Sequence, residues 1–302
     1  TTTKLLATLI SLGLAHGINA QQEAAAGQAE IGVQQAVESS TGPQVSAGYE
    51  FQYIGRTNPF YIDNPVGKEA KSKVMIHTFY GAVELNDTDL TKRVTRNIIG
   101  VMHQTVRYQE DQLSGFDNES QSVFYKGDLQ AIGDWTPSFG LGYSRMEISE
   151  DNVEALDGVS PFLSASKNYG DYLATVKTAY GFTDIKGGLS SDADRLNSWT
   201  TSARIDHLYG LNSRMGLKSA LNLSYSYFNE GTNSGRGDVL FGAGTSLYYT
   251  INKYLRVDLF ADYTRRSSNG ALNGTTLPDG TILDYGFNNW DAGLKLNAAY
   301  SF

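Results

Sequence analysis

Residues 215–228 read MGLKSALNLSYSYF, and the two kinds of side chain in this stretch alternate. Every second position is mostly apolar or aromatic: Met215, Leu217, Ser219, Leu221, Leu223, Tyr225 and Tyr227. The positions between them are small or polar and include Lys218. Because successive side chains of a β-strand point to opposite faces, the stretch predicts a strand with one apolar and one polar face.

The same alternation recurs from residue 44 to residue 302, for example over 44–53 and 255–264. The runs last roughly 10 to 17 residues, which is longer than the usual strand of a soluble sheet and matches a tilted strand that crosses a bilayer. In two of them, 172–182 and 290–302, aromatic residues stand at both ends and smaller side chains between them. The polarity profile of a bilayer favours that order. We therefore predict an all-β fold, a transmembrane antiparallel up-and-down β-barrel over residues 44–302.

Composition agrees with strands and turns. The chain has 302 residues with 32 Gly, 19 Tyr and 13 Phe, and its mean hydropathy of −0.32 is too low for a bundle of transmembrane helices. It has no cysteine, which excludes disulfides, thiolate metal sites and cysteine catalysis. A net charge of −8 gives no electrostatic basis for nucleic-acid binding, and we expect no nucleic-acid partner.

The first 20 residues have the order of a secretory signal peptide. Lys4 precedes an apolar run from Leu5 to Ala15, and a short polar stretch ends at Ala20. We predict a signal peptide over residues 1–20; an ordinary buried helix is the alternative. Residues 21–43 are rich in Ala and Gln, and we expect them to form a short periplasmic or luminal segment.

The end of the chain resembles the bacterial outer-membrane β-barrel proteins, a porin-like class in which we recognise no particular subfamily. The resemblance rests on the apolar or aromatic residues Leu294, Leu296, Ala298, Tyr300 and Phe302. It implies that Tyr300 and Phe302 belong to the signal that the barrel-assembly machinery reads. It also implies a Gram-negative source, an outer-membrane location, and contact with outer-membrane lipid and lipopolysaccharide.

Eleven strands are clear in the sequence: 44–55, 72–85, 94–108, 120–133, 137–148, 170–183, 196–209, 214–228, 237–251, 254–266 and 286–302. Such barrels have even strand numbers, short periplasmic turns and long outer loops. The directions of 137–148 and 170–183 require one more strand between them, and residues 158–166 are the candidate although they contain Pro161. We predict twelve strands; a ten-strand barrel with a long outer excursion over 137–166 is the alternative.

Charged side chains of both signs fall on the polar, inward faces of the predicted strands. The pore-lining candidates are Glu50, Lys126, Asp128, Lys177, Arg204, Asp206, Lys218, Arg256, Asp258, Asp262, Asp291 and Lys295. We expect them to form ion pairs along the wall of a wet or plugged interior with little net charge. A twelve-strand barrel is intermediate between filled small barrels and open porins, so a narrow pore and a nearly closed lumen both remain open.

Two predicted outer loops, 109–119 and 149–157, are acidic and contain no Lys or Arg. Their carboxylates, with Glu110, Asp111, Glu150 and Asp151 as weak metal candidates, are oxygen ligands suited to Ca²⁺ or Mg²⁺. A solvated acidic surface is the simpler interpretation.

Catalytic and cofactor motifs are missing from the sequence. No phosphate-binding glycine loop or helical metal-ligand spacing occurs, and we expect no cofactor. His207 has Asp206 beside it, but neighbours on a strand face opposite ways, so a structural histidine is expected. We predict a passive porin-like channel for small polar solutes and no enzyme. The alternative is a non-channel barrel with a structural, adhesive or receptor role through its outer loops.

Overall fold

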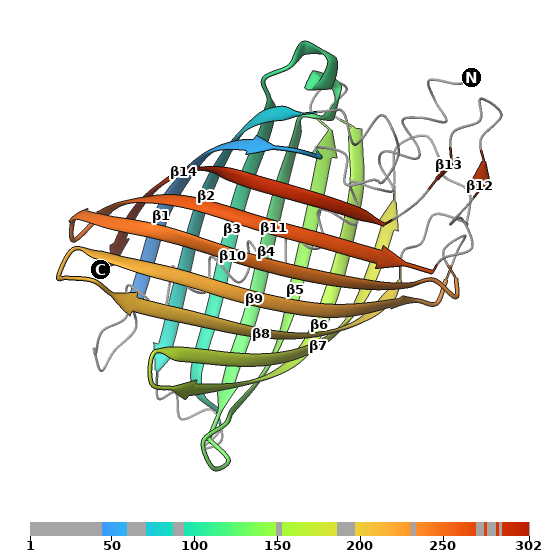
Figure 1. The fold of residues 1–302 in the computed structure, drawn as a ribbon. Coiled ribbons are helices and arrows are strands. Elements are labelled where there is room, and N and C mark those ends of the chain that lie inside the picture. Colours follow the sequence, from blue (N-terminus) through green and yellow to red (C-terminus); the bar gives the residue numbers. More distant parts are fainter. Residues whose placement is uncertain are drawn as a thin grey trace.

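A computed structural model describes residues 44–58, 71–86, 94–148, 153–185, 197–230, 234–269, 275–276, 282–283 and 286–301. The expected signal peptide, the segment 21–43 and Phe302 lie outside these residues. Within them, twelve strands close into an antiparallel barrel in the order β1-β14-β11-β10-β9-β8-β7-β6-β5-β4-β3-β2 (Figure 1). Each barrel strand pairs with its sequence neighbours, apart from the seam between β1 and β14. The prediction of a twelve-strand up-and-down barrel is confirmed.

The barrel strands are β1 (Gln44–Arg56), β2 (Ser72–Asn86), β3 (Val94–Tyr108), β4 (Asn118–Leu129), β5 (Thr136–Ile148), β6 (Val153–Tyr169), β7 (Tyr172–Ile185), β8 (Ser198–Gly210), β9 (Met215–Phe228), β10 (Gly237–Asn252), β11 (Leu255–Ser268) and β14 (Phe287–Ser301). A 3₁₀ helix η1 (Asp111–Phe116) lies between β3 and β4. The short strands β12 (Thr275–Thr276) and β13 (Ile282–Leu283) pair only with each other, outside the barrel. No helix of the described residues is long and apolar enough to span a membrane.

The uncertain twelfth strand is present and is longer than expected. β6 has 17 residues, so the ten-strand alternative is wrong. Pro161 is tolerated because it pairs with Leu141 of β5, while the pairing with β7 is interrupted at Ser160 and Pro161. The loop expected over 149–157 is also wrong, since residues 153–157 already belong to β6. The strand begins early because its ladder with β5 continues through a β-bulge to Val153, which pairs with Ile148; the inward, buried Leu156 does not follow the apolar-out alternation.

Two ends of the barrel differ in their connections. At one end, the turn end, β1 begins, β14 finishes, and short connections join β6 to β7 and β10 to β11. The turn after β6 has two residues, since Tyr169 pairs with Tyr172, and its Gly170 has a φ of 58°. Two-residue hairpins require such positive φ values. The other end, the loop end, carries the longer connections 57–71, 186–197 and 269–286.

Alternate side chains form an apolar belt on the outside of the barrel. Its middle contains exposed aliphatic side chains from most strands, among them Val101, Val123, Leu141, Leu163, Val176, Ile205, Leu221, Leu259 and Leu294. Aromatic side chains border it near the turn end, with Tyr169, Tyr172, Tyr209, Tyr249 and Tyr300, and near the loop end, with Phe182, Trp199, Phe241 and Trp290. Aliphatic exposure of this extent needs a lipid environment, and the aromatic borders match its two interfaces.

Candidate functional site

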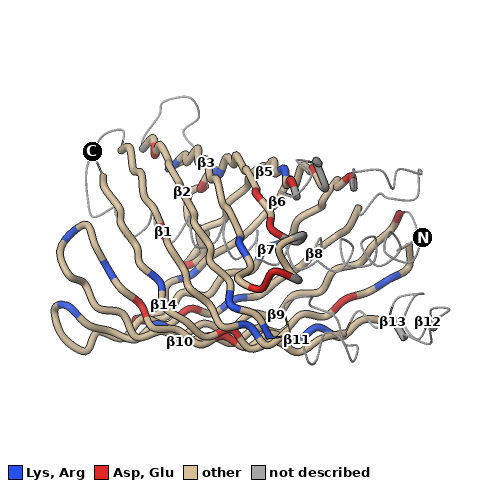
Figure 2. Tube along the Cα trace, turned by 90° about the horizontal axis from the view of Figure 1, so that it is seen from above, with Lys and Arg blue, Asp and Glu red and all other residues tan. Residues whose placement is uncertain are grey.

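The inside of the barrel carries the charged residues that the sequence analysis selected. Eight of the twelve line one cavity of about 470 Å³ in the lumen: Glu50, Arg204, Asp206, Lys218, Arg256, Asp258, Asp262 and Lys295. The cavity lies between the wall formed by β8–β11 and β14 and the side chains of β1–β3. Figure 2 shows basic and acidic positions interspersed along the strands. Their role in lining a conduction path remains a prediction.

The other four candidates face the same interior away from that cavity. Lys126 and Asp128 lie near the turn end, where their charged groups are 3.3 Å apart and both residues are buried. Asp291 lies toward the loop end and binds Arg56. The ammonium group of Lys177 lies 4.6 Å from the centre of the Phe162 ring.

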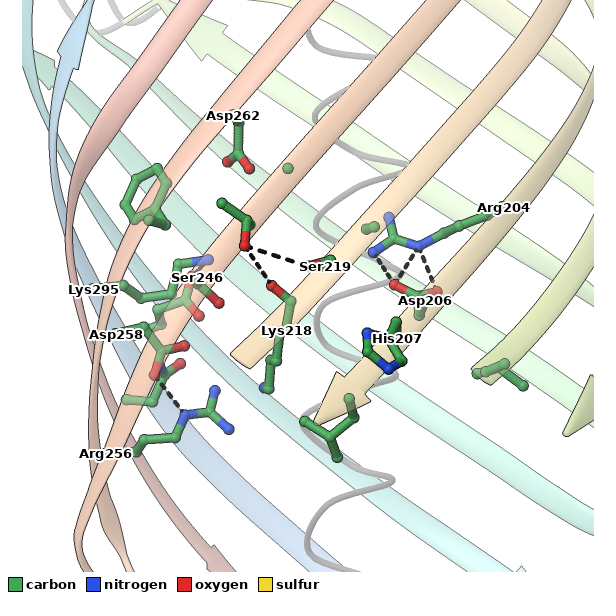
Figure 3. Close-up of a pocket in the computed structure, with 18 of the residues that line it drawn as sticks. Arg204, Asp206, His207, Lys218, Ser219, Ser246, Arg256, Asp258, Asp262 and Lys295 are labelled. Carbon is green, nitrogen blue, oxygen red and sulfur yellow. Dashed lines mark hydrogen bonds and ion pairs between the residues drawn. The ribbon is translucent and has the colours of Figure 1, made fainter. Parts of the chain in front are cut away.

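Several lumen ion pairs join residues two positions apart, while others, such as Arg56 with Asp291 and Arg96 with Glu84, join different strands. Arg204 and Asp206 are 2.6 Å apart, and Arg256 donates to Asp258 at 2.8 Å (Figure 3). Lys126 with Asp128 and Arg236 with Asp238 repeat the arrangement. Side chains two positions apart point to the same face of a strand. A basic residue followed two positions later by an acidic residue can therefore form an ion pair with it. Nine of the twelve candidates form ion pairs, and Lys177, Lys218 and Asp262 form none within the described residues. The two-residue spacing was a signal that the sequence analysis did not use.

Three charged groups of the cavity have no such partner within the described residues: Lys218, Asp262, and Asp171 in the turn between β6 and β7. Lys218 forms no ion pair with any described residue, and its ammonium group lies 5.6 Å from the centre of the Tyr248 ring. Asp262 accepts no hydrogen bond within the described chain and lies directly opposite Asp291 of β14. Besides Arg204–Asp206 and Arg256–Asp258, the cavity contains a third ion pair, in which Lys295 Nζ lies 3.8 Å from Glu50 Oε1, a long distance for such a pair. The lumen is therefore close to neutral overall but uneven locally.

Several aromatic rings of the lumen pack against glycines on the neighbouring strand. Gly48 pairs with Tyr80, Gly100 with Phe124, Gly140 with Phe162, and Gly216 with Tyr248. At each of these glycines an added Cβ would collide with the ring of the partner. The rings consequently lie flat over backbone instead of projecting into the lumen. Sequence reasoning assigned strand glycines to bending and close packing but did not identify these partners.

We expect Gly216→Ala to narrow the lumen. The new methyl group would displace the Tyr248 ring toward the lumen, since the ring is a movable side chain and the strand backbone is not. Single-channel conductance should roughly halve, because conductance through a narrow pore depends steeply on its constriction. Gly242→Ala is the matched control on β10: its Cβ would make only an ordinary 3.8 Å contact with Asn222. Equal conductance of the two variants would contradict this function of Gly216.

The three histidines of the barrel lie on outward-facing positions. The Tyr49 hydroxyl is 2.7 Å from His77 Nδ1, and the His207 ring stacks on Tyr172 with centroids 4.4 Å apart. His103 lies between Phe79 and Gln121 on neighbouring strands. Asp206 instead binds Arg204 on the other face of β8, as expected. In the described chain, no Ser or acidic side chain is hydrogen-bonded to these histidines.

The acidic-loop candidates are dispersed. Glu110 accepts hydrogen bonds from the Ser72 hydroxyl and from the Lys73 amide at 3.0 Å, and Asp111 is exposed at the start of η1. Glu119 belongs to β4 and pairs with Arg107 at 2.6 Å. Glu150 and Asp151 lie outside the described residues. Within the described residues no group of three or more potential metal ligands occurs.

We expect the contact of Glu110 with Ser72 and Lys73, at the loop end, to depend on pH. Desolvation, the largest single effect, raises the pKa of Glu110, but the hydrogen bonds from Ser72 and Lys73 together lower it below its ordinary value. A depressed pKa means that the contact stabilises the folded loop above the ordinary pKa and is lost as the pH falls through the folded value. At neutral pH, Glu110→Gln should therefore speed hydrogen exchange of the Lys73 amide. Asp111→Asn is the control and should leave that rate unchanged.

Of the expected assembly residues, Tyr300 lies outward at the turn end and stacks on Tyr254 with ring centroids 5.1 Å apart. An interfacial position at the end of the last barrel strand is compatible with the predicted recognition role. That role remains a prediction.

No protein-family model matches the sequence. No curated protein matches it either. Among solved structures, an outer-membrane channel from Pseudomonas putida F1 is similar with a TM-score of 0.52 and 9% identity, over 88% of this chain and 98% of the other. The translocator domain of the autotransporter NalP from Neisseria meningitidis is similar with 12% identity and a TM-score of 0.46. The similarity covers 94% of this chain and 97% of the other. Phospholipase A from the outer membrane of Escherichia coli is similar with 15% identity and a TM-score of 0.43. The similarity covers 83% of this chain and 89% of the other.

These similarities identify a fold. It is the fold of the bacterial outer-membrane β-barrels, as the residues at the end of the chain indicated. Together with the apolar belt and its aromatic borders, it places the barrel in the bacterial outer membrane. A fold does not determine a function, so the function is argued from the lumen.

Proposed function

We propose that this outer-membrane β-barrel is a narrow passive channel for small polar solutes, with its turn end in the periplasm. The observation that carries the proposal is the cavity of about 470 Å³ inside the lumen, lined by side chains of both charges. Charged groups that keep contact with water favour a wet interior, because desolvating so many would be costly. Solutes would exchange part of their hydration for contacts with this wall.

Two features support a passage limited in size. The rings of Tyr80 and Tyr248 lie against glycines of the wall, and the long side chains of Arg204, Lys218 and Arg256 line the cavity. A cavity of about 470 Å³ suits water and small solutes and is far too small for a folded protein.

Planar-bilayer recordings of the purified barrel test the proposal. We expect steady single-channel currents in KCl and faster liposome swelling with small polar solutes than with oligosaccharides. The absence of steady current would overturn the channel proposal and favour a barrel that acts through its outer loops.

Ion selectivity provides a sharper test of which residues face the path. Paired charges should give wild type little preference between K⁺ and Cl⁻. The double variant Lys218→Glu/Lys295→Glu changes the lumen by four charge units and should raise the K⁺/Cl⁻ permeability ratio roughly threefold or more, with a larger effect at low salt. The readout is the reversal potential under a KCl gradient. Lys167→Glu/Lys253→Glu makes the same charge change outside the cavity and should not alter it.

A further inference from the structure

We propose that the lumen holds a subsite for the carboxylate group of a small permeating solute, formed by Lys218 with the neighbouring Arg256 and Asn297. The inference rests on the proposed channel function and specifies its substrate class. The three residues come from β9, β11 and β14 and line the same cavity. Figure 3 shows the Lys218 side chain extending toward Arg256 and away from Asp262.

The first argument is the local excess of positive charge. The charged groups that act on Lys218 are Arg256 and Lys295, of the same sign, and Asp258 and Glu50, of the opposite sign, whereas the cavity as a whole also contains Arg204, Asp171, Asp206 and Asp262. Asp258 binds Arg256 at 2.8 Å, and Glu50 lies 3.8 Å from Lys295. After these pairings Lys218 remains as the additional positive charge. A bound anion would balance this additional positive charge.

The second argument is the position of two cations over one ring. The Lys218 ammonium is 5.6 Å and the Arg256 guanidinium 5.7 Å from the centre of the Tyr248 ring. The two charges are therefore no more than roughly 11 Å apart, and at that distance their repulsion is appreciable in a partly desolvated lumen. A carboxylate between them would replace this repulsion with two charge-assisted contacts.

The third argument is a hydrogen-bond donor without an acceptor. Asn297 Nδ2 is buried and has no hydrogen-bond partner in the described chain. Asn297 stands directly opposite Arg256 in the β11–β14 ladder. Buried donors are rarely left unsatisfied in native proteins. Asn297 lines the same cavity as Lys218 and Arg256, so its amide is the third donor of the proposed subsite.

The same residues define the chemical class. Asp258 and Glu50 remain close by, so a doubly charged anion such as a phosphate ester would meet repulsion, and a singly charged carboxylate is preferred. On the facing wall, Gln104 and Thr78 are neutral polar groups joined by a hydrogen bond of 3.1 Å. They suit hydroxyl groups. We therefore assign the subsite to small polyhydroxy or similarly polar monocarboxylates.

Gluconate and sorbitol provide a matched pair of probes, since they differ by a carboxylate in place of a hydroxymethyl group. Added gluconate should reduce the KCl current of the wild-type channel in a concentration-dependent way, and sorbitol should not. In Lys218→Gln the half-blocking concentration of gluconate should rise about fivefold, as expected for one partly screened charge contact. Lys218→Arg should retain the block. Lys177→Gln is the control, because Lys177 also faces the lumen over an aromatic ring but lies outside the cavity.

Equal block of wild type and Lys218→Gln, or equal block by sorbitol, would overturn the subsite and leave the channel proposal standing. If wild type carries no current, the channel proposal fails, and thermal unfolding decides the subsite separately. Gluconate should then raise the unfolding temperature of wild type and of Lys177→Gln but not that of Lys218→Gln. Equal shifts in all three proteins would overturn it.

Discussion

Leu294→Arg should lower the free energy of unfolding by about 2–4 kcal/mol, because it places a charge at mid-depth on the lipid-facing side. Leu294 is outward and 39% exposed, and it pairs with Tyr53 of β1 and Leu259 of β11. On the same strand, Trp290 stands near the loop end and Tyr300 near the turn end. The measurement is reversible unfolding in denaturant with the barrel in lipid vesicles.

Ser267→Arg is the control for depth. Ser267 is exposed near the loop end of β11, beyond the aromatic border, and the same new charge there should cost about 0–1 kcal/mol. Equal costs at the two positions would contradict the assignment of the apolar belt to the bilayer interior.

The fold was predictable because its decisive signal is local. Period-two alternation over long runs, with aromatic residues at the ends, is visible strand by strand, and parity then supplied the weak strand around Pro161. The extent of that strand was not predictable in the same way. Its first residues, from Val153, looked like an acidic loop, and only the ladder with β5 shows that they belong to the sheet.

The candidate site was predictable only in part. The period-two rule assigned Lys218 and Arg256 to the inward face, since face depends on position alone. Their surroundings depend on register across strands, which one sequence does not specify. The pairing of Gly216 with Tyr248, and the lack of an ion pair between Lys218 and any described carboxylate, both follow from the register of the strands. The bidentate pair between Arg56 and Asp291 joins residues 235 positions apart and was equally hidden.

Asp291→Ala should destabilise the barrel by about 3 kcal/mol, because it leaves a buried guanidinium without its main partner. Arg56 donates from Nε and Nη2 to Asp291 at 3.0 Å each, and the Arg56 side chain is only 2% exposed. Asp291 also accepts a bond of 2.8 Å from Asn289. The two charged residues stand opposite each other across the β1–β14 seam, where the first and last barrel strands meet. Unfolding in lipid vesicles measures the loss.

Asp262→Ala is a control of the same residue type. Asp262 is the partner of Asp291 across the β11–β14 ladder and has neither a hydrogen bond nor an ion pair within the described chain. Two carboxylates directly opposite each other repel, so removing Asp262 should change stability by less than about 0.5 kcal/mol or increase it slightly. A loss of stability as large as that of Asp291→Ala would show that either of these two facing carboxylates stabilises the barrel, whether or not it binds Arg56.

A double-mutant cycle then separates the seam contact from the cost of an unpaired charge. If Asp291→Ala is harmful because Arg56 is left buried and unpaired, Arg56→Met/Asp291→Ala should recover a large part of the lost stability. If instead the carboxylate of Asp291 stabilises the seam through Asn289, the double variant should be at least as unstable as the single one. Because β1 and β14 are joined by no connecting loop, the seam depends on its own pairing, and recovery by Met would show that apolar packing closes this barrel as well as an ion pair does.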